Sequence, residues 1–96
     1  MEVAYSAAKG GVNSFTKALA KELSPSNIQV NAVAFGVIDT RMNACFSEEE
    51  MKNLISGIPA DRIGSVREAA AMVRQVLYAP DYLTGQIISM DGGFTG

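Results

Sequence analysis

The sequence predicts an α/β fold, in which helices pack on a sheet of parallel strands. Three observations predict it: apolar residues at helical spacing over 5–23, a nearly continuous apolar run at 28–34, and a short apolar run at 86–90. Two helix-start signals lie between the apolar runs. Strands separated by about fifty residues that contain helices are most simply parallel and joined by a right-handed crossover.

The composition fits one small folded domain and excludes several classes of function. The chain has 96 residues, of which 48% are hydrophobic and 19% charged, so it is too apolar for a disordered segment. The net charge is −2 and the eight basic residues are scattered, which argues against a nucleic-acid partner. The chain has no histidine, so it holds no Ser-His-Asp or Cys-His catalytic machinery.

The sequence also indicates a cellular compartment. Cys45 is the single cysteine, which excludes an intrachain disulfide and indicates a reducing environment. No apolar run approaches the ~20 residues that span a bilayer, and the first residues lack the pattern of a signal peptide. We therefore expect a cytoplasmic protein with no membrane partner.

Residues 5–23 form the first predicted helix. Its apolar face comprises Ala8, Val12, Phe15, Leu19 and Leu23, at steps of four, three, four and four residues. Lys17 and Lys21 lie on the other side, and Pro25 within the segment 24–27 ends the helix.

A strand is predicted at 28–34, where the apolar run is typical of a parallel strand covered on both faces. Gly36 ends this strand, and residues 35–46 have no clear period, which indicates a loop. Because the loop leaves the carboxyl end of a strand, it is a candidate for carrying a functional site.

Two capping boxes predict the next two helices. Ser47 and Glu50 open a short helix that runs to about Ile55, and Ser65 and Glu68 open a helix that ends before Pro80. The carboxylates of residues 48–50 are expected to stabilise a helix start and not to bind a metal, because no histidine or suitably spaced aspartate accompanies them.

A last strand at 86–90 completes the order helix, strand, loop, two helices, strand. Two strands alone make a poor sheet, and the strand at 28–34 would offer a bare apolar edge. We therefore infer a piece of a larger α/β sheet.

Tyr5 and Lys9 are the candidate catalytic residues. They are four residues apart near the start of the first helix, so their side chains project from the same face about one turn apart. An ammonium near a phenol stabilises the phenolate, which makes the pair a plausible general acid/base for a substrate carbonyl or hydroxyl. The other interpretation is a surface tyrosine beside a solvated lysine.

The residues around this pair extend the pattern. Tyr5–Val12, Phe15–Leu23 and Ile28–Ala34 closely resemble the catalytic helix and the next strand of the short-chain dehydrogenase/reductase family. The likeness covers essentially the whole chain, because it continues through Gly36–Thr40, Ile58–Pro59, Arg62–Gly64, Tyr82–Gln86 and Asp91–Gly93. Within the family, the chain is most similar to the 3-oxoacyl-ACP reductase group.

A finer likeness concerns Ala34–Asn43 and Ser47–Glu50, which also resemble the aminopentanone reductases that modify elongation factor P. Phe35 stands where the family usually has a proline, which removes a rigid φ and adds an aromatic ring beside the nicotinamide region.

The resemblance implies a fold and a reaction. The fold would be the C-terminal portion of a Rossmann-like doubly wound parallel sheet, and the reaction would interconvert a carbonyl and an alcohol by hydride transfer. Tyr5 would protonate the carbonyl oxygen, and Lys9 would stabilise the phenolate and bind the nicotinamide ribose. In the cofactor-binding loop, next to Gly36, Ile38 would offer backbone groups to the carboxamide, and Thr40 would offer its hydroxyl to the carboxamide or to a nearby phosphate.

The resemblance also implies that the glycine-rich phosphate loop and the remaining dinucleotide-binding half belong upstream of Met1. Residues 1–96 would then be the C-terminal catalytic half of one domain, with residues 35–64 as a substrate lid. The cofactor would be NADP(H) or NAD(H), the substrate a small carbonyl compound or an acyl-ACP, and the assembly a homo-oligomer. The alternative is a catalytically incompetent fragment that acts at most as an oligomerisation module.

The proposed lid has apolar and long side chains suited to covering a substrate. These residues are Arg41, Met42, Phe46, Met51 and Ile55. A mobile lid and simple packing of the lid helix are both consistent with this pattern.

Overall fold

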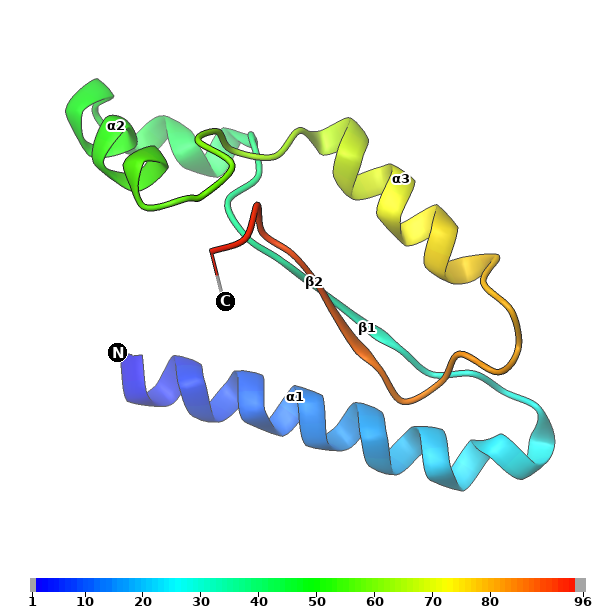
Figure 1. The fold of residues 1–96 in the computed structure, drawn as a ribbon. Helices are drawn as coiled ribbons and strands as arrows, with labels where there is room; N and C mark the ends of the chain where they lie inside the picture. The colour runs from blue at the N-terminus through cyan, green and yellow to red at the C-terminus, as the bar shows by residue number, and fades with distance from the viewer. Residues whose placement is uncertain (1, 95–96) are drawn as a thin grey trace. The chain divides into compact units, whose positions relative to one another are not determined.

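The computed structural model describes residues 2–94, and within that range it leaves out the side chains of Glu2 and Met42. In chain order the elements are α1 (Glu2–Leu23), η1 (Ser24–Ser26), β1 (Ala32–Phe35), η2 (Arg41–Cys45), α2 (Glu48–Ser56), α3 (Val66–Leu77) and β2 (Ile87–Met90), as Figure 1 shows. The predicted α/β class is confirmed, and so is the predicted order of helices and strands.

The two strands pair in parallel. The Ala32 N–H donates to the Gln86 carbonyl at 2.9 Å, and the Gly36 N–H donates to the Met90 carbonyl at 3.0 Å. Both partners advance in the same direction along the chain, which is the parallel pattern that the sequence predicted. The first strand is shorter than predicted, however, because residues 28–31 form no regular ladder.

The chain divides into two compact units, which are described separately. Within the described residues, unit 1 comprises residues 2–33 and 78–88, and unit 2 comprises residues 34–77 and 89–94.

In unit 1, the side chain of Asn31 makes hydrogen bonds that join the segment before β1 to the segment before β2. Its side-chain amide donates to the Leu83 carbonyl at 3.1 Å, and its side-chain oxygen accepts the Gln86 N–H at 3.1 Å. Thr84 supports the same turn, because its hydroxyl accepts the Val30 N–H at 3.0 Å. The Gly85 N–H also donates to the Val30 carbonyl at 2.7 Å, so residues 30 and 31 are joined to the turn by a mixture of backbone and side-chain bonds, and the regular ladder begins only at Ala32.

The packed face of α1 differs from the predicted one. Thr16 and Ala20 are the buried residues of this helix, with exposed fractions of 5% and 3%, whereas Val12 and Phe15 are 58% and 64% exposed. The buried Thr16 hydroxyl keeps a hydrogen-bond partner, because it donates to the Val12 carbonyl at 2.8 Å. Small side chains are thus the most deeply buried residues of α1, and the apolar face predicted from the sequence is exposed at Val12 and Phe15.

A close approach at Gly85 explains the choice of small residues. Gly85 has a φ of +71°, and a Cβ added there would lie 3.4 Å from the Cβ of Ala20. A glycine adopts this left-handed conformation without strain, and alanine leaves room for the turn to reach the helix.

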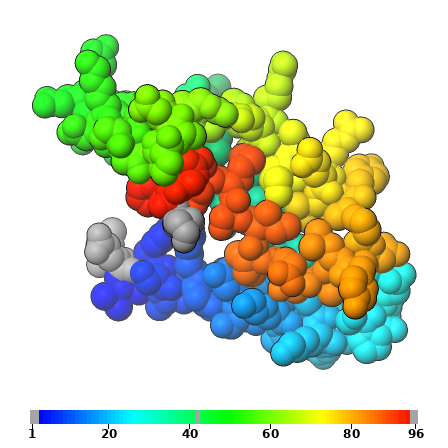
Figure 2. Space-filling model, in the orientation of Figure 1, coloured from blue at the N-terminus to red at the C-terminus, as the bar shows by residue number. Residues whose placement is uncertain are grey.

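In unit 2, the turn after β2 packs against the segment that follows α2. Figure 2 shows the red C-terminal atoms in contact with the green atoms of that segment, where the Ala60 N–H donates to the Gly92 carbonyl at 2.9 Å. Gly92 has a φ of +65°, and an added Cβ would lie 2.8 Å from Ile58, which is itself only 5% exposed. Glycine is therefore required for this contact.

Both predicted capping boxes of unit 2 are present. At the start of α2, the Glu50 N–H donates to the Ser47 hydroxyl at 3.1 Å and the Ser47 N–H donates to the Glu50 carboxylate at 3.0 Å. At the start of α3, Ser65 and Glu68 exchange the same two bonds, each at 3.0 Å. Each pair satisfies two backbone donors that a helix start leaves unpaired.

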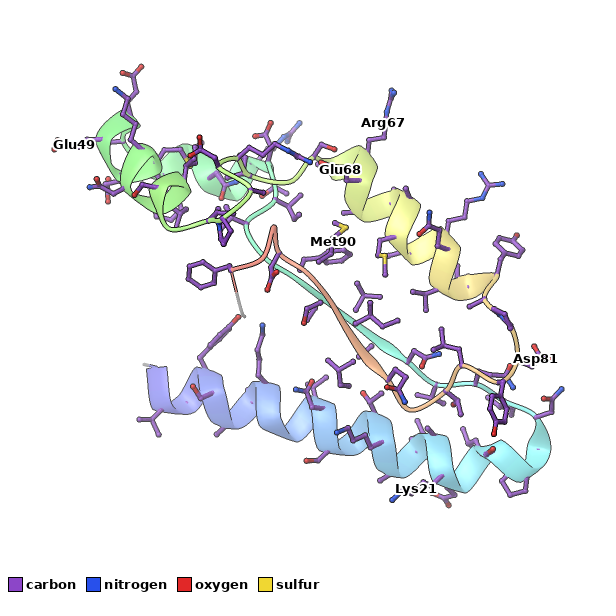
Figure 3. The ribbon with its side chains drawn as sticks, in the orientation of Figure 1. Lys21, Glu49, Arg67, Glu68, Asp81 and Met90 are labelled. Carbon is purple, nitrogen blue, oxygen red and sulfur yellow. The ribbon has the colours of Figure 1, made fainter. Side chains whose placement is uncertain are left out.

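Glu68 has a second partner in Arg62. The two guanidinium nitrogens Nη1 and Nη2 donate to its two oxygens at 2.7 and 2.8 Å. In Figure 3 the side chain of Arg67 extends away from α3, while the adjacent Glu68 lies at the start of the helix. The hydrogen bonds from Arg62 and from the Ser65 backbone lower the pKa of the Glu68 carboxyl to about 2.

Across residues 2–94, no helix is both long enough and apolar enough to cross a membrane.

The Asn31→Ala substitution tests the side-chain hydrogen bonds of Asn31 in unit 1. It leaves the Leu83 carbonyl and the Gln86 N–H without their partner, so we expect the free energy of unfolding to fall by about 1–3 kcal/mol. Urea unfolding measures the loss. The control is Gln29→Ala, because the Gln29 amide donates to the exposed side chain of Asn27, a near neighbour in the chain. An equal loss in the two variants would contradict this role of Asn31.

The pH dependence of stability tests the bonds of Glu68. Because its folded pKa of about 2 lies below the ordinary value of 4.5, its contribution is fully present above pH 4.5 and disappears as the pH falls through about 2. We therefore expect Glu68→Gln to lower the melting temperature at pH 6, and the difference from the parent protein to shrink steadily towards pH 2. Thermal unfolding followed by circular dichroism measures this difference. A gap that stays constant over this range would rule out the stabilised carboxylate.

Candidate functional site

Tyr5 and Lys9 lie one turn apart on α1, as their spacing of four predicts. The Lys9 ammonium nitrogen is 5.5 Å from the centre of the Tyr5 ring. Tyr5 is 63% exposed, so its hydroxyl is open to a ligand. The two side chains share a face of the helix, and the positive charge stands within cation–π range of the aromatic ring.

The loop after β1 carries the other predicted site residues, all in unit 2. It is less irregular than its sequence indicated, because Ile38 forms a parallel bridge with Gly64 and residues 41–45 form the helix η2. The Asp39 N–H donates to the Gly64 carbonyl and the Gly64 N–H donates to the Val37 carbonyl, both at 2.8 Å. The bridge was not predicted from the sequence, in which the apolar residues Val37, Ile38 and Ile63 were the available signal.

Ile38 is held on its other edge as well. Its carbonyl accepts a hydrogen bond from the side-chain amide of Asn43, which belongs to η2. Ile38 is half-buried, and its segment is fixed from two directions, by the bridge to Gly64 on one edge and by Asn43 on the other.

Thr40 stands at the N-cap position of η2 with extended backbone angles, φ −123° and ψ 171°. Its hydroxyl makes no capping bond, and the residue is exposed. The side chain is therefore not used to start the helix, and its hydroxyl is accessible to a polar group of a ligand.

Gly36 is a point of close approach. A Cβ added there would lie 2.7 Å from the Cβ of Asp91 and 2.8 Å from its Cα. Only glycine fits between β1 and the turn after β2 in this arrangement, so Gly36 fixes where the loop that contains Ile38 and Thr40 begins.

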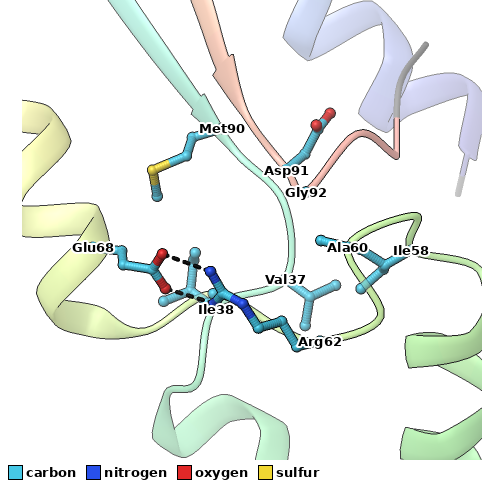
Figure 4. A pocket seen from close by; sticks show the side chains of 10 residues that line it. Val37, Ile38, Ile58, Ala60, Arg62, Glu68, Met90, Asp91 and Gly92 are labelled. Carbon is cyan, nitrogen blue, oxygen red and sulfur yellow. Dashed lines mark hydrogen bonds and ion pairs between the residues drawn. The ribbon is translucent and has the colours of Figure 1, made fainter.

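A small pocket of unit 2 lies beside this loop, as Figure 4 shows. Arg62 and Glu68 face each other in it, with Val37 and Ile38 among the other lining residues. Sequence analysis noted Arg62 only within the family likeness and Glu68 only as a cap. No pattern in the sequence predicts this ion pair, because two opposite charges six residues apart meet only when the turn between them folds back.

The predicted lid segment contains η2 and α2. Phe46 is 42% exposed, and Met51 and Ile55 on α2 are half-buried. Within residues 2–94, no group of three or more cysteine or acidic side chains is arranged to hold a metal ion.

The predicted site residues thus fall into two groups. Tyr5 and Lys9 lie in unit 1, and Gly36, Ile38 and Thr40 lie in unit 2. In each group, exposed or half-buried polar groups are positioned by local structure, by the helix turn in the first and by the bridge to Gly64 in the second.

Comparison with known proteins gives a consistent result. Residues 1–95 match the family model described as enoyl-(acyl carrier protein) reductase. The oxidoreductase YmfI of Bacillus subtilis is 46% identical over 94 residues, which are 97% of this chain and 39% of that protein. The 3-oxoacyl-[acyl-carrier-protein] reductase FabG of Aquifex aeolicus is 45% identical over 93 residues, or 96% of this chain and 38% of that protein.

A solved structure shows the same fold. The crystal structure of a 3-oxoacyl-[acyl-carrier protein] reductase from Brucella melitensis superposes with a TM-score of 0.88 at 34% identity, over 96% of this chain and 35% of that one. The chain therefore corresponds to less than two fifths of the length of these relatives. The helix, loop and strands described above, together with these matches, make the chain a member of the short-chain dehydrogenase/reductase family, with 3-oxoacyl-ACP reductases among its relatives.

Proposed function

We propose that this chain forms the C-terminal catalytic part of an NAD(P)(H)-dependent oxidoreductase that reduces a 3-oxoacyl group carried by acyl carrier protein. The observation that carries the proposal is the Tyr5 and Lys9 pair, exposed on one face of α1 with the ammonium 5.5 Å from the ring centre. Its support is that a relative named for this reaction is 45% identical over the same segment.

In this proposal Tyr5 is the general acid. Its hydroxyl donates a proton to the carbonyl oxygen as that oxygen gains negative charge, and in the reverse direction it accepts the proton of the alcohol. The nearby Lys9 ammonium favours the phenolate that remains after the transfer, because an opposite charge stabilises the ionised form.

The residues present fit a nicotinamide cofactor in their chemistry. The Tyr5 hydroxyl and the Lys9 ammonium are donors suited to ribose hydroxyls, and the uncapped Thr40 hydroxyl and the Ile38 backbone suit a carboxamide. Gly36 lies against Asp91 and so fixes where the loop that carries these groups begins. When bound, the cofactor supplies the hydride.

The dinucleotide phosphates need a further set of residues. Since the chain matches only 38–39% of the length of its relatives, we assign phosphate and adenosine binding to the part of the domain that those relatives have and this segment does not match. Residues 35–64 would serve as the substrate lid, with the exposed ring of Phe46 as an apolar contact for an acyl chain.

The likeness of Ala34–Asn43 to aminopentanone reductases gives a second carbonyl substrate to assay, an aminopentanone group on elongation factor P.

An assembly role for α1 has its own support. Val12 and Phe15 are more than half exposed, although an amphipathic helix normally buries such residues. We propose that this stripe packs against the same helix of a second copy, so that the protein is a homo-oligomer. A chain without catalytic activity would still make this contact. Oligomerisation is therefore the alternative function of the segment.

The Tyr5→Phe substitution tests the catalytic proposal. In the protein expressed from its complete coding sequence, we expect NADPH or NADH oxidation with a 3-oxoacyl thioester, followed by absorbance, to fall about 10²–10⁴-fold, since the proton donor is lost while the ring remains. Tyr82→Phe is the matched control, because Tyr82 is fully exposed in the other segment of unit 1 and has no proposed role. Tyr5→Phe with more than half of the parent rate would refute the assignment.

The Phe15→Glu substitution tests the assembly proposal. A charge on the stripe should disfavour burial, so we expect a smaller particle in size-exclusion chromatography with light scattering. Lys17→Glu changes the charge of α1 outside the stripe and should leave the mass unchanged. If Phe15→Glu keeps the mass of the parent protein, the stripe is not the interface.

A further inference from the structure

The direction in which Ile38 faces depends on a single residue of a distant turn. The only backbone partner of the Val37–Asp39 segment on that edge, among the described residues, is Gly64, which accepts from Asp39 and donates to Val37. In a parallel bridge these two bonds use the neighbours of Ile38, so the N–H and C=O of Ile38 itself point to the opposite edge. Gly64 therefore determines which backbone groups the loop presents.

Gly64 lies between two residues that bind the same carboxylate. On one side, Arg62 donates to Glu68 through both guanidinium nitrogens at 2.7 and 2.8 Å. On the other side, the Ser65 N–H donates to Glu68 at 3.0 Å. One side chain in the first turn of α3 thus holds both ends of the turn that contains Gly64.

The same turn has one more internal bond. The Arg62 guanidinium also donates to the Ile63 carbonyl at 3.2 Å. The side chain of Arg62 therefore fixes the backbone directly before Gly64 as well as bonding to the helix. A planar guanidinium has several N–H donors at fixed angles, so it can bond to the Glu68 carboxylate and to the Ile63 carbonyl at the same time. A lysine ammonium lacks this planar arrangement of donors.

The contact between Gly64 and Ile38 leaves little tolerance. A Cβ added at Gly64 would lie 2.7 Å from Cδ1 of Ile38. Figure 4 shows Arg62 and Glu68 joined by their two bonds close to Ile38. Because Gly64 is joined to Val37 and Asp39 by two backbone bonds of 2.8 Å, a shift of the turn would be transmitted to the Val37–Asp39 segment.

We propose that Arg62 and Glu68 are positioning residues for the cofactor-binding loop, which they hold through Gly64 so that the Ile38 backbone faces the nicotinamide carboxamide. This inference rests on the proposed function, since it assigns the ion pair to the site proposed there. Neither residue touches the reacting atoms in this proposal. Their effect passes through the bridge between Gly64 and Ile38.

Amide hydrogen exchange tests the coupling without any cofactor. In the protein expressed from its complete coding sequence, we expect Glu68→Gln to reduce the protection of the Asp39 and Gly64 amides about tenfold, measured by NMR. Asn31→Ala is the control, because it destabilises unit 1 and should leave these two amides unchanged. Equal loss of protection in both variants, or none in Glu68→Gln, would overturn the inference.

Kinetics test the consequence for the cofactor. We expect Glu68→Gln to raise KM for NADPH about tenfold while kcat changes less than threefold, and Asn31→Ala to leave KM within twofold. Arg62→Lys keeps the positive charge but loses the pair of parallel hydrogen bonds to Glu68, so it should raise KM for NADPH less than Glu68→Gln does. Because the pair acts as one unit, the double variant should be no worse than Glu68→Gln alone.

The outcomes separate the two proposals. An unchanged KM in Glu68→Gln, with normal Tyr5-dependent turnover in the parent protein, would overturn the positioning role and leave the proposed function intact. A parent protein without NADPH or NADH oxidation would overturn the proposed function and the cofactor role of the pair together, while the exchange experiment would still decide whether Glu68 holds the loop.

Discussion

The backbone of residues 30–39 obtains its hydrogen bonds from three distant partners in turn, and the rest of the structure depends on this sequence of partners. Val30 and Asn31 bond to the turn that precedes β2, Gly36 bonds to the end of β2, and Val37 and Asp39 bond to Gly64. Each buried N–H or carbonyl needs a partner, so a break at any point would leave polar groups unsatisfied. After Gly36 the hydrogen-bond partner changes from β2 to Gly64, and there the chain passes from the strand into the loop of residues 37–40.

Glycines make this arrangement possible because they occupy the points where segments touch. Gly36 lies against Asp91, and Gly64 lies against Ile38, in each case with no space for a Cβ. Gly36 lets its backbone approach the backbone of Asp91, and Gly64 leaves room for the Ile38 side chain, while side chains nearby make the specific hydrogen bonds. Asn31 does so in unit 1 and Glu68 in unit 2, each through two or more bonds to groups separated along the chain.

The proposed chemistry has a different physical basis in the two units. The Tyr5 and Lys9 pair needs only a helix, because one turn brings a phenol and an ammonium together. The loop needs tertiary contacts, because the bridge to Gly64 and the helix η2 set the positions of Ile38 and Thr40. In the proposed function, the helix would hold Tyr5 and Lys9 at a fixed separation for proton transfer, and the contacts of the loop would orient its backbone for the cofactor.

The sequence by itself determined the features that depend on near neighbours. Both capping boxes, the shared face of Tyr5 and Lys9 and the parallel pairing of two apolar runs follow from spacing and residue type. Only the tertiary structure decided which side of α1 is packed, because Ala20 meets Gly85 there and leaves Phe15 outside. It also decided that Ile38 pairs with Gly64 and that Arg62 reaches Glu68. The residues in these contacts lie close together because the chain between them folds back, and no local sequence pattern indicates that they will meet.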